Sequence, residues 1–180
     1  VPIGSSTRNT RTPPACRAAP VVVAMGRFDR FCTVALNENT FSAASNVTGI
    51  VSGGVVASGD LNNDLRTDLA TYQNGKLIVN FHGTGEKKEY EVQEQSIQEI
   101  ALHDFDNDGW LDVWLVGDRV KVWRNTGQSG LKNVSEALGT TTLNGPFASI
   151  DFADFDIDGD SDAVLTLQGG GLRYLRNDGG

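Results

Sequence analysis

Three acidic segments of nine residues share one spacing of oxygen-bearing side chains, at positions 1, 3, 5 and 9. They occupy residues 60–68, 104–112 and 154–162. A tight loop turns alternate side chains inward, where a hard cation such as calcium collects about six to eight oxygen ligands. Neighbouring carboxylates repel one another when no cation is present. Asp, Asn and Gly also form ordinary turns, but three loops with the same spacing favour three metal sites.

Eleven aspartates and one asparagine supply these oxygens: Asp60, Asn62, Asp64, Asp68, Asp104, Asp106, Asp108, Asp112, Asp154, Asp156, Asp158 and Asp162. Position 6 is a glycine in two loops, Gly109 and Gly159, but it is Leu65 in the first. Glycine makes a sharp left-handed turn without steric cost, whereas leucine does not. We therefore expect the first loop to be the weakest of the three sites.

The residues after each loop exclude an EF-hand, because position 12 is Thr71, Leu115 or Leu165 instead of the bidentate glutamate. These downstream segments are short, apolar and rich in β-branched and aromatic residues, which indicates strands. Each loop also follows an apolar run and precedes a turn and a third strand. A fourth segment is visible at residues 89–92 and around residues 131–138. The loops begin 44 and 50 residues apart. This period predicts an all-β fold made of β-propeller blades, each with four antiparallel strands.

The pattern Asp-Phe-Asp-x-Asp-Gly-x-x-Asp is followed by an apolar strand and closes on Arg-Asn-x-Gly at residues 124–127 and 176–179. It resembles the FG-GAP/VCBS repeats of β-propellers over residues 50–180. Residues 122–139 resemble the subgroup related to cartilage acidic protein and the ASPIC/UnbV proteins. The resemblance implies that the twelve side chains named above bind calcium, with about three Ca²⁺ ions in all. It adds the position 7 backbone carbonyls as ligands, from Arg66, Trp110 and Asp160.

The repeat divides the chain into five expected parts: an extended basic arm at 1–17, a degenerate blade without calcium at 18–49, and blades at 50–94, 95–143 and 144–180. The last blade is expected to be incomplete, because it has three strands. Small propellers close with about four to eight blades. We therefore expect part of a larger or multi-chain propeller, in which another polypeptide or further sequence supplies the missing strand.

The formal net charge of −8 is unevenly distributed along the chain. Residues 1–30 carry five arginines and one aspartate, and the remaining residues are strongly acidic. This asymmetry suggests that the arm docks on an acidic surface, although a solvated basic leader explains it equally well. The overall acidity argues against nucleic-acid binding.

The two cysteines, Cys16 and Cys32, are predicted to form a disulfide in an oxidising compartment; two free thiols are the alternative. Abundant calcium outside cells suits sites of this kind. The predicted location is therefore secreted, periplasmic or at the cell surface. No apolar run is long enough to cross a membrane.

No catalytic motif accompanies the two histidines, so we do not predict an enzyme. The predicted function is a calcium-binding extracytoplasmic propeller scaffold that mediates protein–protein interaction or assembly. An alternative is a lectin-like module that binds glycans and uses Trp110 as a ligand contact. A third reading is a non-catalytic part of a secreted enzyme.

Overall fold

The computed structural model describes residues 54–82, 84–93 and 96–179, together with the backbone of four two-residue strands closer to the N-terminus. These short strands form two antiparallel pairs: β1 (Cys32–Thr33) with β4 (Ser45–Asn46), and β2 (Leu36–Asn37) with β3 (Thr40–Phe41). The expected basic arm and most of the expected calcium-free blade lie outside the described residues. The same holds for Cys16 and for the side chain of Cys32, so the disulfide stays a prediction.

Eleven strands in the described residues form three antiparallel sheets, which confirms the predicted all-β fold. The first sheet contains β5 (Val55–Gly59), β6 (Asp68–Gln73), β7 (Lys76–Asn80) and β8 (Lys87–Glu91). The second contains β9 (Ile97–His103), β10 (Asp112–Gly117), β11 (Val120–Asn125) and β12 (Leu131–Asn133). The third contains β13 (Phe147–Ala153), β14 (Asp162–Leu167) and β15 (Leu172–Leu175).

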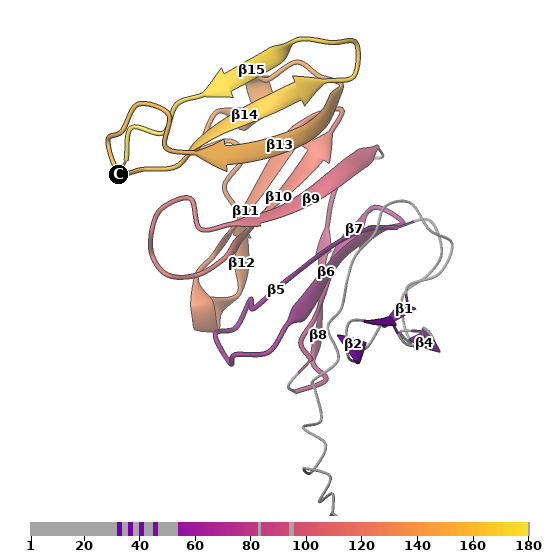
Figure 1. Cartoon of the computed structure of the whole chain (residues 1–180). Coiled ribbons are helices and arrows are strands. Elements are labelled where there is room, and N and C mark those ends of the chain that lie inside the picture. The colour runs from indigo at the N-terminus through magenta and orange to yellow at the C-terminus, as the bar shows by residue number, and fades with distance from the viewer. Residues whose placement is uncertain are drawn as a thin grey trace, which may run out of the picture.

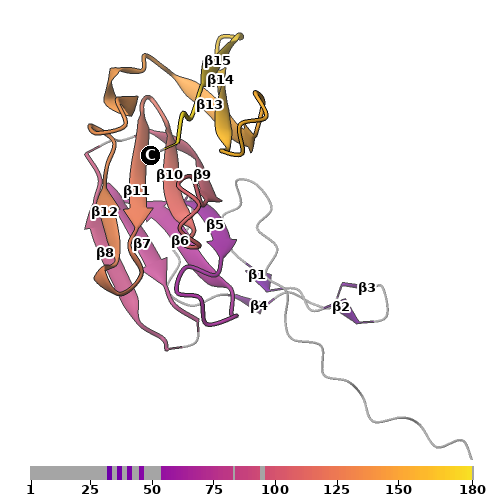
Figure 2. The same cartoon turned by 90° about the vertical axis from the view of Figure 1, so that its left-hand side faces the viewer.

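The strands of each sheet pair in chain order, as consecutive hairpins of a propeller blade do. The sheets stack one after another, with β9–β12 in the middle, and do not close into a ring (Figure 1; Figure 2). Two 3₁₀ turns, η1 (Gly127–Ser129) and η2 (Thr140–Thr142), are the helical elements of the described residues. Within the same residues, no helix has the length and apolar character needed to span a membrane.

Two apolar cores hold the stack together, one on each face of the middle sheet. In β10, Val113 and Leu115 enter the core shared with the first sheet, while Trp114 and Val116 enter the core shared with the third. Alternate residues of a strand face opposite sides, so β10 is buried along its whole length. Trp123 joins the first core. Trp114 and Trp123 are thus both packed between neighbouring sheets, on opposite faces of the middle one.

The fourth segment of the second sheet is shorter than expected, because β12 ends at Asn133 instead of continuing toward residue 138. The hydroxyl of Ser135 accepts the Val122 N–H at 2.8 Å, a donor that a longer strand would have paired. Beyond it the chain turns through η2. In the third sheet β15 is an edge strand, since the described residues provide no fourth strand beside it.

Glu99 links the second and third sheets, because its Oε2 accepts the backbone N–H of Ile150 at 2.8 Å. Burial raises the pKa of Glu99 above its usual 4.5, the Ile150 N–H opposes this rise, and Asp151 adds to it. The ionised form therefore costs stability in the folded protein, and this cost appears as the pH rises from 4.5 through the folded pKa.

We predict that Glu99→Gln, which keeps an acceptor for Ile150, is more stable than the wild type above that pH window and equally stable below it. Urea unfolding in EDTA from pH 4 to 8 measures the difference. The exposed Glu136→Gln is the control for loss of one surface charge and should show no such pH dependence. Equal curves for Glu99→Gln and wild type would show that the burial of Glu99 carries no cost.

Candidate metal centre

Each acidic loop wraps its backbone around the carboxylate at position 1. The two oxygens of Asp104 accept N–H groups from Asp108 at 3.0 Å and from Gly109 at 2.8 Å. Asp60 and Asp154 make the same pair of contacts in their own loops. These hydrogen bonds close the loop and keep the position 1 oxygens on its inner side.

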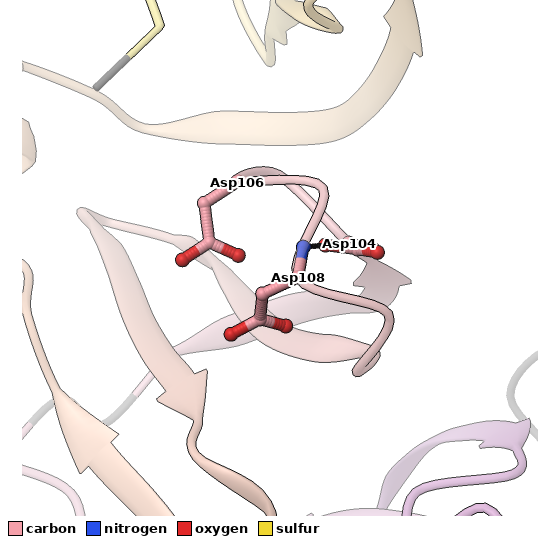
Figure 3. Close-up of side chains that lie close together, drawn as sticks. All are labelled: Asp104, Asp106 and Asp108. Carbon is pink, nitrogen blue, oxygen red and sulfur yellow. Dashed lines mark hydrogen bonds between the residues drawn. The ribbon is translucent and has the colours of Figure 1, made fainter.

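The second and third loops each bring three carboxylates together. Oxygens of Asp104, Asp106 and Asp108 lie within 4.8 Å of one another, and Figure 3 shows the three side chains projecting from one loop. In the third loop the trio is Asp154, Asp156 and Asp162, so the position 9 carboxylate joins it instead of the position 5 carboxylate. Among the described residues, no third acidic trio comes this close.

The first loop differs from the others at position 3, which is Asn62. Its amide Nδ2 donates to Asp64 Oδ2 at 3.1 Å, so a neutral donor stands where the other loops have a carboxylate. Asp64 accepts the Arg66 N–H at 2.9 Å, as the position 5 aspartates of the other loops do with their own position 7 residues. The first loop thus has the same backbone path but a less charged interior.

The position 9 aspartates are fully buried at the start of each second strand. Asp68 accepts N–H groups from Leu61 and His82, Asp112 from Phe105 and Asn125, and Asp162 from Phe155 and Asn177. In each case one donor lies in the loop and the other lies at the end of the third strand. The carboxylate therefore fixes the loop to the body of its sheet.

The position 9 carboxylates differ in acidity because their surroundings differ. Burial raises the pKa of Asp112 to about 7, despite the opposing backbone N–H groups of Asn125 and Phe105. Burial also raises the pKa of Asp68. The pKa of Asp162 is lowered instead, mainly by the Asn177 N–H and further by the Tyr174 hydroxyl, which donates to Oδ2 at 2.8 Å. A carboxylate is costly to bury unless such donors surround it.

The residues of the second and third loops fit a hard cation. Every inward-facing donor is an oxygen, which is the ligand type that calcium prefers. Oδ1 of Asp106 is buried and accepts no hydrogen bond from the described residues. Burial, and then the charge of Asp108, raises the pKa of Asp106, and burial and Asp158 do the same for Asp156. A bound cation would supply the partner that Oδ1 lacks and would relieve this charge crowding.

Positions 4 and 6 of all three loops have left-handed backbone conformations. At position 6, Leu65 has φ of 65° where the other loops have glycine, as the sequence pattern predicted. At position 4, Ile157 has φ of 63°, whereas the other loops use Asn63 and Asn107, which tolerate this region. The third loop therefore carries a strained β-branched residue that the glycine pattern did not reveal.

The position 7 residues, Arg66, Trp110 and Asp160, donate their N–H groups to position 5 carboxylates. Metal ligation by their carbonyls stays a prediction. Trp110 is half-buried, and its indole packs closely against Gly127. A Cβ atom on that glycine would lie only 2.8 Å from the indole Cζ2. The indole lines a cavity of about 200 Å³ together with Phe81 and Tyr90. Glycan contact by Trp110 likewise stays a prediction.

Two asparagines that the sequence indicated only as turn residues connect neighbouring sheets. Asn125 Nδ2 donates to the carbonyls of Leu61 at 2.8 Å and Leu111 at 3.1 Å. Asn177 Nδ2 donates to the carbonyl of Phe105 at 2.8 Å in the same way. The repeated Arg-Asn-x-Gly turn was the available signal, but the acceptor that joins the sheets lies in each case in the loop of the preceding sheet.

Position 4 provides a second contact between loops. Asn63 Nδ2 donates to the Gly109 carbonyl at 3.1 Å, and Asn107 Nδ2 donates to Asp160 Oδ1 at 2.9 Å. The first and second loops thus each reach the loop of the next sheet. The three acidic loops therefore form one connected surface along one edge of the stack.

We predict that Leu65→Asn raises the free energy of unfolding by about 1 kcal/mol, because asparagine adopts the left-handed region at a lower cost than leucine. Leu65 is 94% exposed, so the change removes little packing. Leu138→Asn, at an exposed leucine without a left-handed backbone, is the matched control and should give no gain. Urea denaturation measures both. A loss of stability in Leu65→Asn would show that the loop is not strained at this position.

Residues 104–165 match the family model of the FG-GAP-like repeat. The matched region begins at the first residue of the second acidic loop, contains the whole third loop and ends within β14. No curated protein matches the chain. The match supports the FG-GAP family for the part of the chain that contains both acidic trios and the sheet-connecting Asn125.

Proposed function

We propose that this protein is a calcium-stabilised, propeller-like scaffold that binds other protein chains outside the cytoplasm. The observation that carries the proposal is that one loop geometry occurs three times, along the same edge of three stacked sheets. Each sheet would be one blade, in the units 50–94, 95–143 and 144–180. Residues 122–139 would place the protein near the ASPIC/UnbV-type subgroup.

Calcium would be held by the oxygens at positions 1, 3, 5 and 9 of each loop, with the position 7 carbonyl as a further ligand. Its role would be structural. Closely spaced carboxylates oppose folding without a cation, and a cation that binds only the folded state stabilises it. FG-GAP repeats are typically non-catalytic and extracellular, which agrees with a scaffold that works in a calcium-rich compartment.

The partner surface that we propose is the exposed end of the stack at the third sheet. Position 4 of the first two loops reaches the next loop, but in the third loop this position is Ile157, which is 88% exposed. The position 2 carbonyls of the first two loops accept an asparagine amide from the next sheet. Position 2 of the third loop is Phe155, which is 54% exposed.

Positions 2 and 4 of the loop thus make contacts at both junctions between sheets. On the third loop these positions are Phe155 and Ile157, which are apolar and exposed. A protein chain with a further unit of the same kind would cover them, and its closing asparagine would meet the Phe155 carbonyl. The isoleucine favours an apolar counterpart, because an exposed side chain of this size gains from burial. A second copy of this chain is the simplest partner to test.

Calcium removal is predicted to lower the melting temperature. Each occupied site would contribute about 2.7 kcal/mol at a hundredfold excess of calcium over its dissociation constant. Asp108→Ala and Asp158→Ala should each lose one calcium and more stability than Asp64→Ala, because the first loop has Leu65 in a left-handed conformation where the other two have glycine. Thermal melts in EGTA and calcium, with calorimetric titration, measure this. An unchanged melt without bound calcium would refute the proposed metal sites.

Assembly is predicted to depend on the exposed end of the third sheet. In calcium buffer, light scattering should give a particle larger than the 19.3 kDa chain, and Ile157→Lys should reduce it to the single chain. Leu65→Lys replaces an equally exposed apolar loop residue away from this end and should leave the assembly intact. A wild-type protein that stays at 19.3 kDa at every concentration would rule out self-association.

A further inference from the structure

One residue near the end of the third strand varies between the sheets, and its identity correlates with that of position 3 of the loop. His82, Asn125 and Asn177 are equivalent, because each donates its backbone N–H to the position 9 aspartate of its own loop. The residues immediately before them are therefore also equivalent: Phe81, Arg124 and Arg176. The arginines occur where position 3 is aspartate, and the phenylalanine occurs where it is Asn62.

Both arginines contact the position 3 carboxylate of their own loop. Arg124 Nε lies 2.5 Å from Asp106 Oδ2, and its Nη2 lies 3.1 Å from Asp108 Oδ2. Arg176 Nε lies 3.1 Å from Asp156 Oδ2, and its Nη2 lies 2.6 Å from Asp178 Oδ1. The pairs are partly exposed, so their role is not explained by a large contribution to folding.

An aspartate with an arginine carries no net charge, and neither does an asparagine with a phenylalanine. The position 3 pair is therefore electrically equivalent in all three loops, although its chemistry differs. A cation that enters the second or third loop meets a carboxylate whose charge is already shared with a guanidinium. The same guanidinium stabilises the crowded carboxylates while the cation is absent.

We propose that Arg124 and Arg176 are charge-compensating residues that stabilise the calcium-free loops and weaken calcium binding at these sites. The proposal rests on the calcium sites proposed above. It separates two effects of one side chain: a residue that merely positioned the ligands would strengthen calcium binding, whereas these arginines oppose it. The arginine near the end of the third strand then lowers the calcium affinity of the second and third loops.

The test compares Arg124→Gln with Arg173→Gln, which removes the same charge from a nearby strand without touching a loop carboxylate. Calorimetric titration with calcium should show one site tightened by about tenfold in Arg124→Gln, because one like-charge contact with the ion is removed. The melting temperature of this variant in EDTA should fall below that of wild type. Arg173→Gln should match wild type in both measurements.

A double variant tests the proposed role of Arg124 independently. Asp106→Asn alone should weaken the site, since the arginine then faces the ion without its carboxylate. Asp106→Asn with Arg124→Gln restores a neutral pair like that of the first loop and should bind calcium within about threefold of wild type. Unchanged or weaker binding by Arg124→Gln overturns the proposal while leaving the calcium sites in place. A wild type that binds no calcium refutes the calcium sites themselves, and this proposal with them.

Discussion

Each sheet has a fully buried aspartate where its second strand begins, and its carboxylate joins the acidic loop to the end of the third strand. A buried carboxylate is tolerated only when donors surround it, and here backbone N–H groups provide them. The loop cannot move independently of the sheet, because one side chain accepts hydrogen bonds from both. The other ligand positions of the loop depend on this attachment for their placement.

The edge of the sheets that bears the acidic loops also carries polar contacts between sheets. Apolar side chains fill the space between the sheets, but apolar contacts alone tolerate sliding and rotation. The amides of Asn125 and Asn177 each reach a carbonyl of the preceding loop, which sets the sheets at a defined position relative to one another. A cation held in a loop would thus act next to the junction between two sheets. Under the proposed function, metal binding would therefore be coupled to the rigidity of the stack through these few residues.

The charged groups of the loops are balanced locally. Asp106 and Asp156 lie beside arginines from the third strand, and Asp162 is further stabilised by the Tyr174 hydroxyl. Within the described residues Asp112 accepts hydrogen bonds from backbone N–H groups but from no hydroxyl, and burial raises its pKa to about 7. The loops have similar backbones, so their differences in cation affinity would arise from these neighbours.

The sequence by itself determined the all-β fold, the repeat and the position of each acidic loop, because strand alternation and loop spacing are local properties of the chain. It also indicated the left-handed position at Leu65. It did not reveal the strain at Ile157, since nothing in the residue pattern marks position 4 as left-handed. Nor did it identify Asn125 or Arg124 as more than turn and strand residues. Their partners lie in other elements, Leu61 in the preceding sheet and Asp106 in the loop, and only the packing of strands and sheets brings those atoms together.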